Sequence, residues 1–474
     1  MSQDTNLKYV AQDAVHYSAA DDPSVLGETT ERHRRQDSYD QRENLNSTSS
    51  DVIHSANDNA HSSSPQTSMT VSEAVEHIGM GPFQILIIVI CGLFTFADAM
   101  EMLLLAVLGP ILQCEWLLGE FYVAFITTIV FIGYMVMAPV WGGLSDHYGR
   151  KNTLIVVCLW IAFYGFLTAF SPTYGWVLIL RGMVGAGIAG ASQAFVLTSE
   201  YIPSVWRARL LVASGIFWTF GSLFEIGIAA AIVPNIPRDA AIPGWRVLVL
   251  VSSLPTALVA LTMKWLPESA RFLVAAGRDA EAKEVLDAAC KMNKAPKLPY
   301  ALKPEPAVTR GHIRDLFNST TMTLSTLACW LLWFTAAFSY YGMILLSAVL
   351  MEHEECNGEA ESALVTGNDA GGSNAGTVCS CAPPSNETYV SMLLSTFGEF
   401  ASIWLNFVTL DRFGRKKSMA FYLGLQGVVF FLLIPCGLPN WLITTLTFII
   451  RGVSASFFNA VYSKFNSINI FTFY

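Results

Sequence analysis

Six ionisable residues interrupt otherwise apolar stretches of the sequence, and these are the side chains best placed to do chemistry: Asp98, Glu101, Arg181, Glu225, Glu399 and Arg451. Asp98 and Glu101 stand three positions apart, so on a helix they share one face. Charges in such surroundings are costly and usually face a partner or a cavity. We therefore expect Arg181 to pair with one acid while a second acid binds and releases a proton. The alternative is a set of structural ion pairs that fix how helices align.

The glycines after Arg181 present a second candidate site. Gly185, Gly187 and Gly190 have the G-x-G-x-x-G spacing of a dinucleotide-binding turn. Such a turn needs a preceding strand, a helix that opens at the glycines and an acid about 20 residues later. Here the glycines lie in the middle of an apolar stretch. Together with Gly182 they form a stripe of small residues, which favours close packing of two helices in lipid.

Sequence motifs of common enzymes are missing. The chain has no H-E-x-x-H, no G-x-S-x-G, no C-x-x-C pair and no Walker A run, which are the patterns of several hydrolases, metal sites and ATP-driven machines. We therefore expect no enzyme activity, no metal centre, no cofactor and no binding of nucleic acid.

The elements that must position the charged residues are apolar stretches long enough to cross a membrane. Hydrophobic residues make up 53% of the 474-residue chain and charged residues only 14%, whereas globular domains are about 25% charged. About 20 apolar residues in a helix cross ~30 Å of hydrocarbon. The sequence predicts an all-α membrane protein with ten spanning helices, at 83–109, 121–141, 153–171, 175–198, 209–233, 246–266, 323–350, 389–410, 418–436 and 441–463.

The connections between these helices differ in charge, and Lys and Arg favour the cytoplasmic side. The basic connections are 145–151, 206–209, 267–320 and 411–417, whereas Arg238 is the single Lys or Arg in the opposite set. We therefore expect the basic connections to be cytoplasmic. The polar segment 1–81 is expected to form a disordered tail on the same side.

The longest connection of the opposite set, 351–388, is acidic and is expected to face an oxidising compartment. Cys356, Cys379 and Cys381 lie within it, and Cys114 lies in another connection of that set. Whether a disulfide forms among them, and between which two, stays open. Asn386 begins a glycosylation sequon on the same side, next to a predicted helix.

Two pieces of the sequence recur, which indicates an internal repeat. "SDHYGRK" at 145–151 follows the second predicted helix and "DRFGRKK" at 411–417 follows the eighth, while an Arg-Gly pair lies in the fourth and again in the tenth. A parallel repeat of this kind is typical of two six-helix halves. We predict an N-terminal half at 82–266, a linker at 267–320 and a C-terminal half at 321–474.

With these motifs the chain resembles the major facilitator superfamily. "DAMEMLLL", "GPILQCEW" and "FWTFGSLFE" look closest to its synaptic vesicle 2-related proteins, a branch near the organic-ion transporters. The loop signature of the superfamily and the further motifs of its sugar-porter branch are matched by Asp146, Gly149, Arg150, Lys151, Glu200, Arg207, Arg209, Glu268, Arg271, Asp411, Gly414 and Arg415.

The resemblance implies a secondary transporter that moves a small organic solute or ion through the lipid bilayer by alternating access, with protons as a candidate coupling ion. It also implies that the matched charged residues form a gate at the cytoplasmic rim, although anchoring by positive charge is an alternative. Its membrane would be the plasma membrane or that of an intracellular vesicle. The rival function is a membrane protein that binds ligands or partners without transport.

Aromatic residues at Trp218, Tyr340 and Tyr341 interrupt two of the predicted spans. They are candidates to line a cavity for an aromatic or cationic substrate. The alternative is that they only pack between helices or anchor them at the membrane interface.

The C-terminal end departs from the superfamily. Its members have twelve helices, whereas this chain ends in "YSKFNSINIFTFY", within or just after the tenth predicted helix. The second half also lacks an equivalent of "SEYIPSVWRAR" from the first half. We expect an incomplete or mis-spliced gene model that lacks the last two helices; the alternative is a genuine short isoform. Peptide mass spectrometry of the native protein beyond residue 462 tests that expectation.

Overall fold

The computed structural model describes residues 69–236, 240–298, 302, 316–365, 386–435 and 438–465. Regular structure in these residues is helical, apart from one isolated β-bridge between Met69 and Leu302. The helices of the N-terminal half, residues 82–266, are α3 (Pro82–Trp116), α4 (Glu120–Tyr148), α5 (Arg150–Thr168), α6 (Tyr174–Ile188), η1 (Ala189–Ala191), α7 (Ser192–Tyr201), α8 (Ser204–Ala213), α9 (Gly215–Ile232), α10 (Gly244–Thr262) and η2 (Met263–Trp265). Those of the C-terminal half are α13 (Thr320–Val365), α14 (Asn386–Leu433) and α15 (Asn440–Phe465).

Nine helical segments of the described chain are long and apolar enough to cross a membrane, six in the N-terminal half and three in the C-terminal half. Lipid offers the backbone no hydrogen-bond partners, so a helix is the form such segments must take. Large apolar side chains point outward from the bundle, among them Phe338 and Trp404, which are 71% and 74% exposed. The predicted all-α membrane fold is confirmed.

The ninth predicted span, 418–436, corresponds to the second part of α14. The connection expected at 411–417 is not an open loop, because α14 runs through it and changes direction at Gly414, whose φ is 74°. The matching connection in the N-terminal half turns at Gly149, whose φ is 96°. Positive φ angles of this size favour glycine, so the glycine of the repeated motif makes the turn in both halves.

Two other predicted boundaries differ from the structure. The segment 1–81 was expected to be disordered, but its end forms α2 (Val71–Ile78); residues 1–68 lie outside the described residues. Thr70 and Glu73 start α2 with a capping box, in which each side chain accepts a hydrogen bond from the backbone N–H of the other residue. The second difference is that α13 continues to Val365, into the expected outer loop, where Glu and Ala favour helix.

Glycines bring helices into backbone contact at the same place in each half. A Cβ atom on Gly133 of α4 would lie 2.2 Å from the carbonyl oxygen of Gly182 in α6. In the C-terminal half, a Cβ on Gly452 of α15 would lie 2.7 Å from the carbonyl oxygen of Gly398 in α14. These contacts leave no room for a side chain, so they fix the two helix pairs.

The glycines of the G-x-G-x-x-G pattern are packing positions in α6 and η1. A Cβ on Gly185 would lie 2.1 Å from the carbonyl oxygen of Val130, and a Cβ on Gly187 or Gly190 would lie 2.6 Å from the side chain of Ile161 or 2.3 Å from that of Val157. No strand precedes them within the described residues. The arrangement is that of helices packed in lipid.

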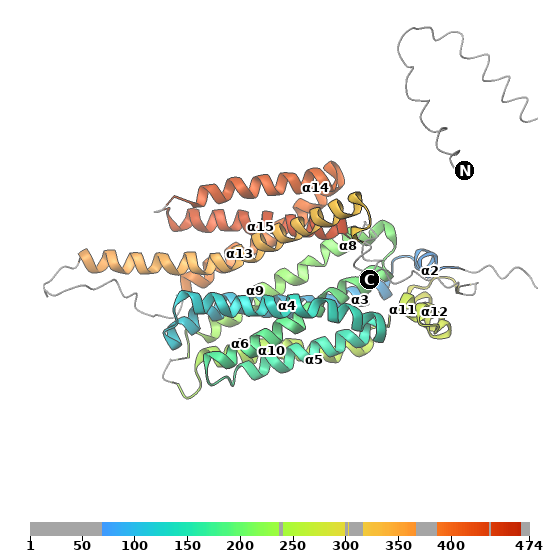
Figure 1. Ribbon diagram of the computed structural model, residues 1–474, viewed down its shortest axis with the longest axis horizontal. Coiled ribbons are helices and arrows are strands. Elements are labelled where there is room, and N and C mark those ends of the chain that lie inside the picture. The colour runs from blue at the N-terminus through green and yellow to red at the C-terminus, as the bar shows by residue number, and fades with distance from the viewer. Residues whose placement is uncertain are drawn as a thin grey trace, which may run out of the picture. The chain divides into compact units, whose positions relative to one another are not determined.

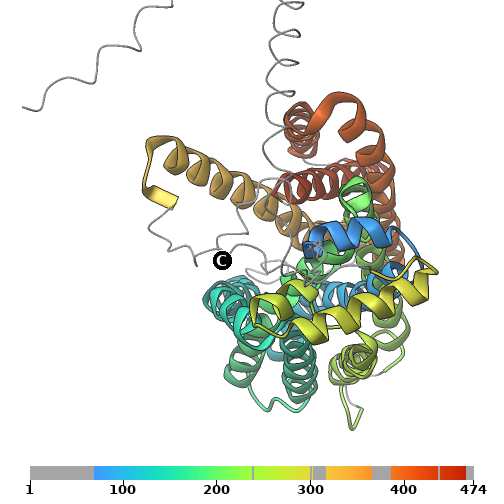
Figure 2. The ribbon, with the colours of Figure 1, turned by 90° about the vertical axis from the view of Figure 1, so that its right-hand side faces the viewer.

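Three short helices gather at one end of the bundle. They are α2, α11 (Ala270–Ala275) and α12 (Asp279–Asn293). Figure 1 shows them at the right-hand end, with α13–α15 along the upper side and α4, α5, α6 and α10 along the lower side. Figure 2 looks onto that end and shows the short helices lying across it. We call it the basic end, because it carries the basic connections 145–151 and 206–209.

Candidate functional site

Arg181 of α6 forms an ion pair with Glu101 of α3 inside the N-terminal half. Its Nη1 lies 3.0 Å from Oε2 of Glu101, and both side chains are buried. Breaking a buried pair by removing one partner costs about 3–5 kcal/mol, because the other charge is left uncompensated. The pair also fixes the neighbouring α5, since a Cβ on Gly165 would lie 3.0 Å from Oε1 of Glu101.

Asp98 lies one helical turn before Glu101 on α3 and has no comparable partner. Its side chain is buried, and its Oδ1 accepts no hydrogen bond from any described residue. The guanidinium of Arg181 is bonded to Glu101. An unpartnered carboxylate inside a membrane protein is costly, so Asp98 is stable only when it carries a proton or has a cation beside it.

Glu225 of α9 is held by a neutral group. Its Oε1 accepts a hydrogen bond from Oγ of Ser252 in α10 at 2.8 Å, and its Oε2 has no partner in the described chain. The sequence pointed to Glu225 but not to Ser252. The signal that could have identified Ser252 is that it is a serine within a long apolar stretch.

The buried charges of the C-terminal half form a cluster of three residues. Oε1 of Glu399 in α14 lies 3.0 Å from Nη2 and 3.3 Å from Nε of Arg451 in α15. The hydroxyl of Tyr340 in α13 donates to the same oxygen at 3.1 Å. All three side chains are buried. Tyr340 therefore orients the acid besides packing between helices.

The two halves carry their acids on different helices. The separation that aligns the two loop motifs, 265 residues, also pairs Gly133 with Gly398 and Tyr134 with Glu399. A tyrosine of α4 thus stands where the C-terminal half has its acid. The acid of the N-terminal half is instead Glu101 on α3. Despite this difference in position, Arg181 and Arg451 each form an ion pair with an acid of their own half.

A cavity of about 120 Å³ lies between the halves, and residues of both halves line it. Asp98 and Trp218 belong to one wall, and Tyr340, Tyr341 and Glu399 belong to the other. One water molecule occupies roughly 10–15 Å³ of such a cavity volume. The cavity therefore has room for several waters or a small solute. The structure therefore brings two of the six buried charges and the three candidate aromatic residues to one cavity.

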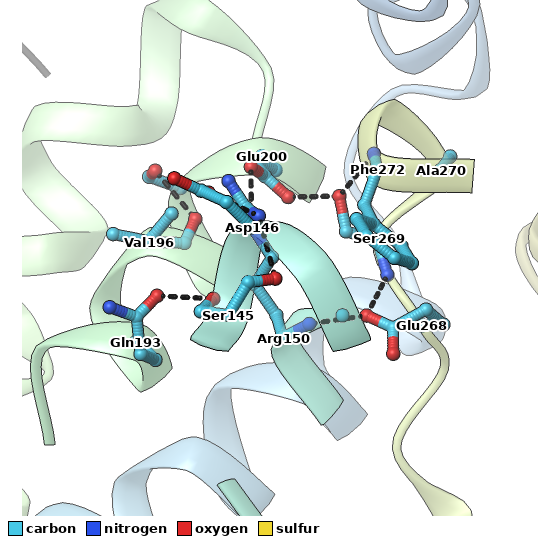
Figure 3. Close-up of polar contacts among 12 residues, drawn as sticks. Ser145, Asp146, Arg150, Gln193, Val196, Glu200, Glu268, Ser269, Ala270 and Phe272 are labelled. Carbon is cyan, nitrogen blue, oxygen red and sulfur yellow. Dashed lines mark hydrogen bonds and ion pairs between the residues drawn. The ribbon is translucent and has the colours of Figure 1, made fainter. Parts of the chain in front are cut away.

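A network of charges at the basic end surrounds Arg150 (Figure 3). Its Nη1 lies 2.8 Å from Oδ1 of Asp146, and its Nε lies 3.5 Å from Oε1 of Glu200. Glu268 approaches from the linker, and its Oε1 accepts from the backbone N–H groups of Arg150 at 2.8 Å and Lys151 at 3.1 Å. A carboxylate in this position satisfies N–H groups that the first turn of α5 leaves unpaired, and it complements the helix dipole.

Two residues that were not predicted complete this network. The hydroxyl of Ser269 donates to Oε2 of Glu200, and the hydroxyl of Tyr201 donates to the carbonyl of Glu268. Ser269 lies between the two charges of "PESAR", and Tyr201 directly follows the predicted Glu200. Their neighbours in sequence were therefore the only signal that could have identified them.

Two polar contacts hold helix α2 at the basic end. Arg271 donates from Nη2 to Oγ of Ser72 at 2.8 Å. Oε1 of Glu76 accepts from the backbone N–H of Ser204, the first residue of α8, at 2.6 Å. This bond, with a second from the Ser204 hydroxyl, holds the pKa of Glu76 below its usual value.

The remaining predicted gate residues lie in α8 and α14. Arg207 donates from Nε and Nη2 to the carbonyl oxygen of residue 202, and Arg209 lies in the same helix, α8. Gly414 and Arg415 lie in α14, and the side chain of Asp411 falls outside the described residues. Every ion pair found at this end among described side chains lies within residues 82–298.

Whether a disulfide forms stays open, because three of the four candidate cysteines have no described side chain. Cys114 lies near the end of α3. Cys356 is part of α13 without a described side chain, and Cys379 and Cys381 fall between the described ranges. Asn386 is exposed at the first residue of α14, and its glycosylation stays a prediction.

The fold and the cavity define a class of protein. Membrane-crossing helices in two halves, buried charges in each half and a cavity between them are the parts of a secondary transporter of the major facilitator type. Residues 119–368 match the family model described as "Sugar (and other) transporter".

Relatives of known sequence agree with this class. The chain is 39% identical to the human protein SVOPL over 401 residues, which are 84% of this chain and 79% of that protein. It is 38% identical to the synaptic vesicle 2-related protein of Bos taurus over 393 residues, which cover 83% and 69% of the two proteins. The chain therefore belongs to the sugar (and other) transporter family, and it is a multi-pass membrane protein and a secondary transporter.

Solved structures show the same fold. The xylose transporter XylE from E. coli, in a partially occluded inward open conformation, gives a TM-score of 0.58 at 16% identity and covers 82% of this chain and 85% of that chain. The proton:xylose symporter XylE bound to 6-bromo-6-deoxy-D-glucose gives a TM-score of 0.55 at 17% identity, with 81% and 82% covered.

Proposed function

We propose that this transporter moves a small organic solute through the cavity between its halves by alternating access, and that Asp98 couples this movement to a proton. The observation that carries the proposal is the buried Oδ1 of Asp98, which faces no hydrogen-bond donor among the described residues while Asp98 lines the cavity. A buried carboxylate is costly to leave charged. Because that of Asp98 lines the cavity, it can exchange a proton with the solute path.

The neighbouring pairs support this assignment. Glu101 is bonded to Arg181 and Glu225 to Ser252, so Asp98 is the acid of the N-terminal half with the fewest bonds to lose when it changes its protonation. The related structure of XylE is named as that of a proton:xylose symporter, which gives a second reason to look for proton coupling.

We further propose that the basic end faces the cytoplasm. Its connections hold the Lys and Arg that favour that side, and α2 is held at the same end. The network around Arg150 would then act as the cytoplasmic gate. The membrane would be that of a vesicle or the plasma membrane.

The test is solute-driven proton movement in liposomes that contain the purified chain and an internal pH dye. D-xylose, D-glucose and choline serve as probes, and each is also followed as a radiolabelled solute. At least one probe should accumulate with a proton flux, and Asp98→Asn should abolish the pH dependence. Asp279→Asn, an exposed position of α12, is the matched control and should leave it unchanged.

Three results would overturn the proposal. The first is accumulation with the same pH dependence in Asp98→Asn, Glu101→Gln and Glu225→Gln. The second is binding of a probe without accumulation, which is the behaviour of a non-transporting receptor. The third is that no probe binds or moves.

A further inference from the structure

We infer that the cavity binds an organic ammonium ion against Asp98, and that this cation and a proton compete for the same carboxylate. The inference rests on the proposed function, in which Asp98 binds the proton, and it names the class of solute. Three features of the cavity carry it: the sign of its charges, the unmet bonding capacity of Asp98 and an aromatic lining.

The charged side chains that line the described part of the cavity are both acidic, Asp98 from one half and Glu399 from the other. Glu399 is compensated by Arg451 at 3.0 Å, whereas Asp98 is not compensated. A positively charged solute would supply the absent counter-charge. An anionic solute would face an unscreened negative charge in a low-dielectric site, which is unfavourable.

Among the described residues, the ionisable groups near Asp98 supply no cation. The ionisable groups coupled to it electrostatically are Glu101 on the same helix, Tyr134 on α4 and Cys158 on α5, and none of them carries a positive charge. The guanidinium of Arg181 is bonded to Glu101. Neutralisation of Asp98 must therefore come from a proton or from a cation inside the cavity.

Aromatic residues of both halves line the cavity. The ring centroids of Tyr340 and Tyr341 lie 5.3 Å apart, and the ring of Phe458 lies 5.4 Å from that of Tyr340. Trp218 adds a fourth ring, 6.3 Å from Tyr340. Aromatic faces attract ammonium groups by about 0.5–2 kcal/mol each.

The indole of Trp218 indicates a second feature of the solute. Its Nε1 is buried and has no acceptor among the described residues. Because an unmet buried donor is costly, a solute that carries an oxygen near its ammonium group would satisfy it. The site therefore suits a small ammonium ion with a hydroxyl or carbonyl oxygen.

Because the proton and the ammonium ion compete for Asp98, one is released when the other binds. A quaternary ammonium has no proton of its own, so when it binds protonated Asp98 the carboxyl O–H bond breaks, one proton leaves to solvent and the carboxylate stays as the counter-ion. The cavity then holds either one proton or one ammonium. Alternation between the two sides would exchange one ammonium for one proton in opposite directions, with no net charge moved.

The experiment uses choline as a cation of fixed charge and 3,3-dimethylbutan-1-ol as its neutral isostere. Binding of radiolabelled choline to the purified full chain in detergent is measured at a series of pH values, and proton release is followed with a dye in weakly buffered solution. Choline should bind at least tenfold more tightly than the isostere. Its affinity should rise by up to tenfold per pH unit while Asp98 is protonated, and up to one proton should be released per choline bound.

Asp98→Asn should reduce choline affinity at least tenfold and abolish both the pH dependence and the proton release, while Asp279→Asn should change neither. If Asp98→Asn does not fold, the wild-type chain still decides the matter through its pH dependence and proton release. Equal binding of the isostere, affinity for choline that does not vary with pH, or unchanged binding in Asp98→Asn overturns the inference.

The outcomes separate this inference from the proposed function. Proton-coupled uptake of a sugar through Asp98 without choline binding would leave the proposed function standing and remove the ammonium. Choline binding with proton release in detergent, without uptake into liposomes, would support the ammonium site and remove the proposed transport function.

Discussion

Alanine at position 133 tests whether backbone contact between α4 and α6 holds the N-terminal half together. The new Cβ would lie 2.2 Å from the carbonyl oxygen of Gly182, whereas real Cβ atoms essentially never approach a neighbour to less than 3.0 Å. The helices would have to part by about 0.8 Å, the difference between these two distances. Overfilling a packed contact costs about 1–3 kcal/mol, and alanine in place of glycine inside a helix gains roughly 1 kcal/mol.

Gly227 of α9 is the matched control, because it is exposed and nothing lies within 4 Å of a Cβ added there. The gain in helix propensity is common to both variants and cancels. The free energy of unfolding of Gly133→Ala should therefore lie about 1–3 kcal/mol below that of Gly227→Ala. The assay is unfolding in mixed micelles by increasing SDS, followed by circular dichroism. Equal stabilities of the two variants would refute the account of the α4–α6 contact.

Three further predictions concern the ion pairs and the basic end. Glu399→Gln should lower the free energy of unfolding by about 3–5 kcal/mol, because it leaves the charge of Arg451 buried alone, and adding Arg451→Met should restore most of the loss in the same SDS assay. Because the folded pKa of Glu76 is depressed, its contribution to the docking of α2 should be complete above its ordinary value of 4.5 and be lost as the pH falls through the lower folded value. Hydrogen exchange across 71–78 should rise accordingly at low pH, and Glu76→Gln should remove the dependence. Tyr201→Phe removes a buried hydroxyl that donates to Glu268 and accepts from the backbone N–H of residue 270, so exchange at the start of α11 should rise while α15 stays protected.

The spans could be predicted from the sequence because an apolar run of membrane length has few alternatives to a helix. That Arg181 would pair with an acid also followed, because a charge in an apolar span needs a partner. Which acid the arginine would bind did not follow, because that depends on how α3 and α6 rotate against each other. Rotation is set by contacts such as that between Gly133 and Gly182, and a single sequence does not state such pairs.

Short-range signals in polar surroundings were the ones overlooked. The Thr70–Glu73 capping box is visible in the sequence, yet it lies at the end of a long polar segment that outweighs it. Ser269 and Ser252 are ordinary serines until the fold brings a carboxylate to each. The turn at Gly414 was expected, but the continuation of helix on both sides of it was not, because the charges around it are typical of a loop.

Both buried ion pairs lie inside a half, and neither crosses between them. Glu101 with Arg181 joins α3 to α6, and Glu399 with Arg451 joins α14 to α15. Contacts between the halves include aromatic ones such as α9 to α14, where the rings of Phe220 and Phe400 are 5.2 Å apart. Among the described residues, tilting one half over the other thus separates neither of these two ion pairs. It changes contacts such as those between the rings, where dispersion is worth about 0.1–0.2 kcal/mol per atom pair, so each half keeps its own buried charges compensated during such a movement.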